Sequence, residues 1–357
     1  MPVRVGGGTT LAHIISTINL KGGVGKTTIT AALAEILAGE HGKRVLIIDL
    51  DPQTNLTIFM IGEVRWQELN DSGRTLATLF RDAVDPGPAG SLFDIDLALQ
   101  RDVSPVGSVT QVDMLASSLD LIDLQDRLLP PAGGLVHNPV ELLHRQIEKV
   151  ADDYDYILVD CPPNLSVLTL NGLRISHGYI VPTIPDVMST YGIPQIRSRI
   201  QKFAMSVDRP IPAVGLVISK YRASVSLHRQ TADYLARSAK ETGLHVFDSR
   251  IPDSTEIAEA AEFNDWGTLR QRYGYHRHYD ALAALAVEFM AAVEVGLADQ
   301  RLAVGVEGRV GRVDPAGADA EVHPIGGIAG VGDGHRGGGA AGCAGGEGEP
   351  ARGEGQE

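Results

Sequence analysis

Short apolar runs alternate with stretches of helical periodicity over most of the chain. Between the runs, apolar positions recur at helical spacing, as in residues 29–37 and 143–150. The runs suit strands that are buried on both faces, and they span residues 14–18, 45–48, 112–115, 157–159, 179–181 and 214–218. Strands and helices in alternation require right-handed crossovers between parallel strands. The pattern predicts one α/β domain over residues 11–295, with a mostly parallel sheet and helices on both of its faces.

Three segments depart from this alternation. Residues 1–10 lack the apolar stretch of a secretory signal, and we expect them to form a flexible N-terminus. Residues 63–110 combine Asp, Gly, Pro and Ser with weak periodicity, which predicts a variable insertion of loops and short helices. From Gly296 onward the chain contains no Phe, Tyr or Trp, and its end is dominated by glycine. We therefore expect residues 296–357 to be a disordered, glycine-rich acidic tail.

A glycine-rich segment with two lysines, KGGVGKTT, lies between the first predicted strand and the helix that follows it. Glycines let the backbone wrap closely, so that successive N–H groups and the helix N-terminus point at phosphate oxygens. Lys26 would supply a charge to the β- and γ-phosphates, and the Thr27 hydroxyl a ligand to Mg²⁺. The usual P-loop string begins with glycine where this chain has Leu20, so the match is a deviant Walker A motif and predicts a P-loop NTPase fold. The candidate nucleotide-binding residues of this segment are Lys21, Gly22, Gly23, Val24, Gly25, Lys26, Thr27 and Thr28.

Two predicted strands end in acidic residues at the edge where ligands bind in parallel sheets. The run YILVD ends in Asp160, which we expect beside the Mg²⁺ ion. The run VLIID continues into Asp49 and Asp51, whose i, i+2 spacing places both on one side of an extended chain. One of these two acids should face the γ-phosphate and the attacking water. The candidate metal ligands are Thr27, Asp49 and Asp160.

Three strings together, KGGVGKTT at 21–28, DLDPQTN at 49–55 and DCPP at 160–163, resemble the ParA/MinD group of deviant Walker ATPases. The second and third strings resemble ParA partition ATPases in particular. The resemblance implies an ATP-sandwich dimer in which Lys21 reaches the nucleotide of the partner and Gly23 lies at the close dimer contact. It also implies that Asp51 is the switch acid for hydrolysis, and that Asp160 with residues 161–165 forms a second switch. The catalytic residues would then be Lys21, Lys26, Asp51 and Asp160, and Ile251 and Pro252 would flank the adenine.

The expected nucleotide is ATP, bound with Mg²⁺. Guanine-selective P-loop proteins use an Asp in an N-K-x-D string to accept hydrogen bonds from the base. The nearest candidate here, SKYR at residues 219–222, contains no acid. We therefore expect an ATP hydrolase with weak intrinsic activity.

Charge is unevenly distributed along the chain. The whole chain has 31 basic and 45 acidic residues, a formal charge of −14, and only two cysteines, which indicates a reducing compartment such as the cytoplasm. Residues 197–240 instead contain nine basic residues and two acidic ones. Such a local excess is sufficient for sequence-neutral contact with DNA phosphates. The candidate DNA-binding residues are Arg197, Arg199, Lys202, Arg222 and Arg229.

The resemblance thus implies an ATPase that dimerises on ATP, binds nonspecific DNA on the nucleoid and segregates a chromosome or plasmid. A ParB-like centromere-binding partner would stimulate its hydrolysis. An alternative is an orphan ParA/MinD-like ATPase that positions a protein cargo or a membrane-associated complex. We expect no stable membrane anchor, because no Lys or Arg lies between Arg277 and Arg301 to form a cationic amphipathic helix. An iron–sulfur carrier is disfavoured because Cys161 is the one cysteine of residues 11–295.

Overall fold

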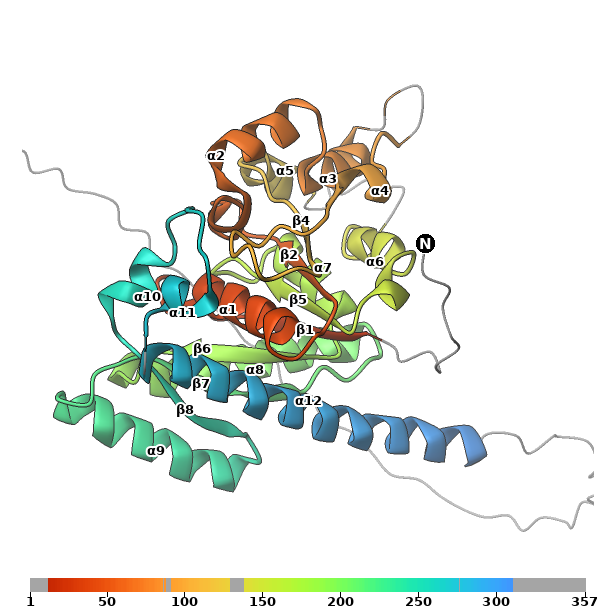
Figure 1. Cartoon of the computed structure of the whole chain (residues 1–357). Coiled ribbons are helices and arrows are strands. Elements are labelled where there is room, and N and C mark those ends of the chain that lie inside the picture. The colour runs from red at the N-terminus through yellow and green to blue at the C-terminus, as the bar shows by residue number, and fades with distance from the viewer. Residues whose placement is uncertain (1–11, 86, 88–90, 129–137, 276, 311–357) are drawn as a thin grey trace, which may run out of the picture. The chain divides into compact units, whose positions relative to one another are not determined.

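A mostly parallel sheet, flanked by helices on both faces, organises the part of the chain that precedes residue 309 (Figure 1). The structure is a computed structural model, and it describes residues 12–85, 87, 91–128, 138–275 and 277–310, without the side chains of 240 and 297–310. The strands are β1 His13–Thr17, β2 Val45–Asp49, β3 Leu99–Gln100, β4 Val112–Leu115, β5 Tyr156–Asp160, β6 Gly178–Thr183, β7 Ala213–Tyr221 and β8 Val246–Pro252. Their order in the sheet is β3-β4-β2-β5-β1-β6-β7-β8. The pairings are parallel except that of β3 with β4. The predicted fold class is confirmed, with all six predicted strands in place.

Helices connect successive parallel strands and cover both faces of the sheet. They are α1 Lys26–Gly39, α2 Asn55–Asp71, α3 Leu76–Val84, α4 Ile95–Ala98, α5 Leu121–Arg127, α6 Leu142–Ile147, α7 Val167–Ile175, α8 Val187–Ser206, α9 Ser226–Thr242, α10 Thr255–Glu259, α11 Leu269–Tyr273 and α12 Arg277–Val310, with a 3₁₀ turn at Ala151–Asp153. No helix in these described ranges is long and apolar enough to cross a membrane.

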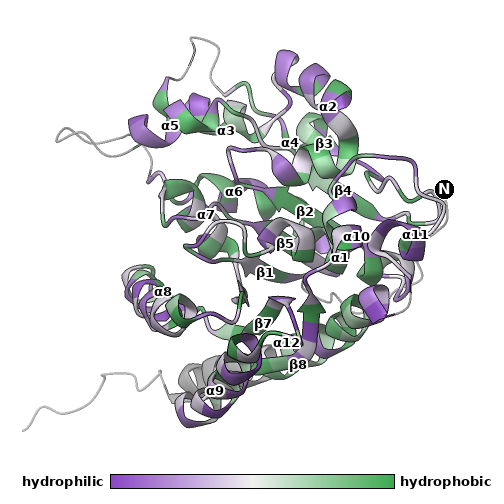
Figure 2. Cartoon of the chain, turned by 90° about the vertical axis from the view of Figure 1, so that its left-hand side faces the viewer, coloured by the Kyte–Doolittle hydropathy of each residue, from purple (hydrophilic) through white to green (hydrophobic). Residues whose placement is uncertain are grey.

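Alternate residues of the central strands enter two separate hydrophobic cores. Ile14 and Leu46 face one core, which is formed with α3 and with α5 to α9. Ile15 and Ile47 face the other, which is formed with α1, α2, α11 and α12. Both faces are buried because crossover helices lie on each side, which is why these strands read as continuous apolar runs. In Figure 2 the strands are largely green, and purple is concentrated on the outer helices.

The segment 63–110 is more integrated than a peripheral insertion. Its first residues complete α2, which bends at Gly62 (φ 75°), where an added Cβ would lie 2.8 Å from the Phe263 ring. Beyond the bend, Trp66 packs into one core, and Phe80 of α3 packs into the other. The short antiparallel strand β3 lies in the same segment. The short helices expected in this segment are therefore present, and α3 buries Leu76, Leu79 and Phe80 in the core.

The last helix continues past the predicted domain boundary at 295. α12 ends at Val310, so residues 296–310 of the expected tail are helical. Eight of these fifteen residues are good helix formers (Ala, Leu, Arg, Gln or Glu), and they offset three glycines. The other tail residues, 311–357, and the predicted N-terminal segment 1–10 lie outside the described residues.

Candidate nucleotide-binding site

The loop between β1 and α1 has the backbone shape that its glycines predict. Gly23 (φ 71°) and Gly25 (φ 84°) lie in the left-handed region, which side-chain-bearing residues rarely adopt. Val24 is buried beneath the loop, and its carbonyl accepts a hydrogen bond from Ser219 Oγ at the end of β7 (2.7 Å). The strand end of β7 therefore supports the loop from behind.

This loop lines a cavity of about 350 Å³ at the carboxyl ends of the strands. Cavity walls come from the loop, from the segment after β2, and from the ends of β5 and β7. The lining residues are Gly22, Gly23, Gly25, Lys26, Thr27, Thr28, Asp51, Gln53, Asn55, Ile58, Phe59, Pro163, Lys220 and Ala261. Ligands of open parallel sheets bind at this edge, where the strand order reverses around β1.

Lys26 lies buried at the base of the cavity. Its Nζ donates to the carbonyl oxygen of Asn19 (3.3 Å), and the Asn19 side chain is itself held by the Pro182 carbonyl (2.7 Å). A buried ammonium group with a single backbone acceptor retains donors for phosphate oxygens.

Asp160 and Thr27 meet next to Lys26 and fit a magnesium ion. Thr27 Oγ1 donates to Asp160 Oδ2 (2.7 Å), while Asp160 Oδ1 is buried and accepts no hydrogen bond from the described residues. Burial raises the pKa of Asp160 to about 7, against the lowering effects of the Thr27 hydrogen bond and the Lys26 charge. Mg²⁺ binds proteins through one or two oxygen ligands together with substrate phosphates. Thr27 and Asp160 are therefore suited to hold it, and when bound it would neutralise phosphate charge.

Asp49 departs from its predicted role as a metal ligand. Its Oδ1 accepts from the Asp51 N–H (3.1 Å), and its Oδ2 accepts from the N–H (2.9 Å) and hydroxyl (2.7 Å) of Thr57. It is fully buried and does not line the cavity. Burial, then the nearby Asp160 carboxylate, raises the pKa of Asp49 well above its usual value. The hydrogen bonds from Thr57 hold the Asp49 side chain against the first turn of α2.

Asp51 is the acid of this pair that reaches the cavity. It lines the wall, and its Oδ1 accepts from the Gln53 N–H (3.0 Å). Across the cavity, Pro163 of the second predicted switch contributes to the wall. The adjacent Cys161 is fully buried close to Gly172, and burial raises the pKa of its thiol to about 12. Cys161 is thus a small packing residue.

Lys21 is not among the residues that line the cavity. Its Nζ forms an ion pair with Asp186, the N-cap of α8, and its side chain is 45% exposed. Asp186 is partly buried, but hydrogen bonds from Lys21 and Ser189 outweigh that effect and lower its pKa. Within its own chain Lys21 is therefore paired with Asp186 and does not line the cavity.

Ile251 and Pro252 do not line this cavity, and their position beside an adenine ring stays a prediction. Ile251 is buried in the core, and β8 pairs with β7 so that Pro252 lies beside Tyr221. Five other lining residues were not predicted from the sequence: Gln53, Asn55, Ile58, Phe59 and Ala261. A sixth, Lys220, lies at the end of a predicted strand, so the strand-end rule could have identified it.

The predicted DNA-binding residues lie on or near α8 and α9. Arg199 and Lys202 are exposed on α8, and Arg222 and Arg229 are exposed near the start of α9. Arg197 is partly buried and donates to the Thr242 carbonyl at the end of α9 (3.4 Å). Three of the five thus have internal partners, because Arg222 also pairs with Asp253 and Arg229 donates to the Ala223 carbonyl. Arg199 and Lys202 are therefore the most available for phosphates.

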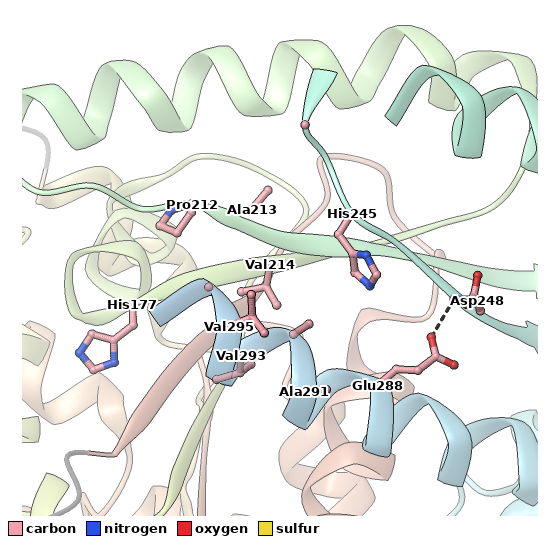
Figure 3. Close-up of a pocket in the computed structure, with 13 residues that line it drawn as sticks. His177, Pro212, Ala213, Val214, His245, Asp248, Glu288, Ala291, Val293 and Val295 are labelled. Carbon is pink, nitrogen blue, oxygen red and sulfur yellow. Dashed lines mark hydrogen bonds between the residues drawn. The ribbon is translucent and has the colours of Figure 1, made fainter. Parts of the chain in front are cut away.

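A second cavity, of about 500 Å³, lies at the opposite edge of the sheet (Figure 3). It is bounded by His177, by the first residues of β7 and β8, and by α12. Its wall is mainly apolar and includes no Lys or Arg. The Glu288 carboxylate there is already engaged by the Asp248 N–H (2.7 Å) and by Ser249. This cavity therefore lacks the lysine and the glycine-rich loop that the first cavity offers to phosphate groups.

Comparisons with known proteins agree with this geometry. A protein-family model described as an AAA domain matches residues 12–211. An uncharacterized protein of Pseudomonas putida is 31% identical over 257 residues, which cover 71% of this chain and 86% of the relative. The chromosome partitioning protein ParA of Caulobacter vibrioides is 29% identical over 253 residues, covering 70% and 84% of the two chains. The chain is also similar to a solved cobyrinic acid a,c-diamide synthase from Mycobacterium smegmatis with bound ATP analogue and magnesium. That match has a TM-score of 0.59 and 25% identity, and it covers 78% of this chain and 93% of the synthase.

The fold and the cavity together define a P-loop nucleotide-binding protein with a deviant Walker A loop. The chain belongs to the ParA family of partition ATPases.

Proposed function

We propose that this protein is a ParA-type ATPase whose two copies close on ATP and Mg²⁺. The position of Lys21 carries the proposal. Four groups suited to nucleotide and metal, Lys26, Thr27, Asp51 and Asp160, lie at one cavity, yet the first lysine of the loop lies outside it on exposed surface. A cation in that position can serve a nucleotide that faces it from a second copy.

In the proposed dimer each group has a distinct task. Lys26 binds the β- and γ-phosphates, and Thr27 and Asp160 hold the Mg²⁺ ion. Asp51 orients the attacking water. Lys21 leaves Asp186 and stabilises charge that develops on the phosphoryl group bound to the partner copy. Loss of the γ-phosphate then removes the bridge between the copies and loosens the dimer.

The proposed role is partition of chromosomal or plasmid DNA in the cytoplasm. The ATP-bound dimer binds nucleoid DNA without sequence preference through the basic residues of α8 and α9, and a ParB-like partner stimulates hydrolysis. The exposed positions of Arg199 and Lys202 and the likeness to a chromosome partitioning protein support this role.

We expect Asp51→Ala to trap the dimer. Without a carboxylate to orient water, hydrolysis should fall by about 10²-fold, the usual contribution of such a group. ATP-dependent dimerisation should persist, because the phosphate and metal groups are intact. Steady-state phosphate release and size-exclusion chromatography with ATP measure the two effects. Asp71→Ala, which removes an exposed acid at the end of α2, is the control. Hydrolysis at the normal rate in Asp51→Ala would assign the role to another acid.

We expect the pair Arg199→Glu and Lys202→Glu to weaken ATP-dependent retention on plain duplex DNA strongly. If the native protein neutralises about four phosphates, log K against log salt should have a slope of roughly −3.6, and losing two contacts should flatten it by about 1.8. The pair Arg74→Glu and Lys149→Glu changes the net charge equally but lies on other elements, so it should bind DNA normally. If both double variants lost DNA affinity equally, net charge alone would explain the binding, and α8 would not be the DNA-binding surface.

A further inference from the structure

The loop after β4, residues 116–118, is hydrogen-bonded to the segment that carries Asp51. Ser117 in this loop is fully buried, and each of its polar groups has a partner. Its Oγ donates to the Asp51 carbonyl (2.7 Å), and its N–H donates to Thr57 Oγ1 (3.0 Å). Its carbonyl accepts from Trp66 Nε1 (3.2 Å). Ser117 thus joins the segment that carries Asp51 to α2 on both sides of its bend at Gly62.

The backbone of Asp51 is held on both sides by this network. Asp49 Oδ1 accepts from the Asp51 N–H (3.1 Å), and the Asp51 carbonyl accepts from Ser117 Oγ (2.7 Å) and from the Thr54 N–H (2.9 Å). Thr57 closes the network, since it donates to Asp49 Oδ2 (2.7 Å) while it accepts from Ser117. Only the carboxylate of Asp51 is left facing the cavity wall. Ser117 does not line the cavity and has no route to direct contact with nucleotide.

We propose that Ser117 is a positioning residue for ATP hydrolysis, which acts by fixing the main chain of Asp51. The inference rests on the proposed function, in which Asp51 orients the attacking water. A group that orients water is effective only when its own freedom is restricted before the reaction. The Ser117 hydroxyl supplies that restriction from the β4 side, across 66 residues of sequence.

The neighbouring Ser118 offers a matched control. It is also fully buried, it belongs to the same loop, and its Oγ lies 2.6 Å from Asn70 Oδ1 near the end of α2. It makes no hydrogen bond to the Asp51 segment. If the loop had a purely structural role, loss of either hydroxyl would have similar consequences.

The test compares Ser117→Ala with Ser118→Ala in the full chain. Ser117→Ala removes the hydrogen bond to the Asp51 carbonyl, and this loss should lower kcat about three- to tenfold. The kcat of Ser118→Ala should stay within about twofold of the native value. Affinity for a non-hydrolysable ATP analogue, measured by calorimetry, should be unchanged in both. Ser117→Cys has a slightly larger side chain and keeps a weak donor, so it should give an intermediate kcat, and it replaces the alanine variant if that chain does not fold.

Two further results decide the proposal. In an Asp51→Ala background, Ser117→Ala should cause no additional loss of kcat, because its effect passes through Asp51. An additional loss there, equal losses in Ser117→Ala and Ser118→Ala, or a parallel fall in analogue affinity would overturn the positioning role. A slow Asp51→Ala together with a normal Ser117→Ala overturns this inference alone, whereas a fully active Asp51→Ala overturns the proposed function.

Discussion

Lys21→Ala should retain nucleotide binding and lose both ATP-dependent dimerisation and turnover. The cavity keeps Lys26, Thr27 and Asp160, so monomeric binding of ATP is expected to persist. Turnover should fall on the order of 10²–10³-fold, the usual effect of removing one donor that stabilises charge in the transition state. Phosphate release and size-exclusion chromatography with ATP measure the outcome.

A mixing experiment separates action on the partner from action within one chain. If Lys21 serves the facing nucleotide, then Lys21→Ala chains mixed with Asp51→Ala chains form dimers with one complete site. That site combines Asp51 from one chain and Lys21 from the other, so turnover should reappear on mixing. Two inactive populations that stay inactive when mixed would show that Lys21 acts in its own chain. Lys43→Ala, on the loop between α1 and β2, is the control for a general loss of positive charge.

Arg272→Ala should be the most destabilising single change in the described domain. The guanidinium group is fully buried, donates to Glu35 Oε1 (2.7 Å) and to the Phe59 carbonyl (3.0 Å), and lies 4.2 Å from the Phe59 ring centre. Glu35 is fully buried too, and it also accepts from Tyr273 (2.7 Å) and Ser104 (2.5 Å). Removing the cation leaves a buried carboxylate without its counter-charge, which costs about 3–5 kcal/mol of unfolding free energy.

Urea unfolding and thermal melts measure this loss, and we expect Tm to fall on the order of 10 °C. Arg270→Ala is the matched control. Arg270 lies on the same helix, but its pair with Asp280 is exposed, so its removal should cost at most about 1 kcal/mol. A loss for Arg272→Ala no larger than that of Arg270→Ala would contradict the argument. The Arg272–Glu35 pair also joins α11 to α1, the helix that follows the phosphate loop. Both helices belong to the core that Ile15 and Ile47 face.

Local sequence information was sufficient for the sheet and the phosphate loop. Continuous apolar runs predict strands buried on both faces, and the glycines at 23 and 25 supply left-handed backbone that a phosphate loop requires. Asp160 was also predictable, because a parallel strand carries its ligand residues at its carboxyl end. These features depend on residues close together in the sequence.

Other features depended on segments that are distant in sequence and only meet in the folded chain. Sequence spacing left Asp49 and Asp51 equivalent, and the first turn of α2 decided between them by engaging Asp49 through Thr57.

By itself, the sequence determined the fold class, the phosphate loop and the acid at the end of β5, since each follows from periodicity or from the conformational range of glycine. Only the tertiary structure decided which acid faces the cavity, where Lys21 is held, and that Ser117 and Arg272 join separate elements. The partners of Lys21 and Arg272 lie 165 and 237 residues away. Such contacts arise from the packing of helices on the sheet, and no local pattern of residues encodes them.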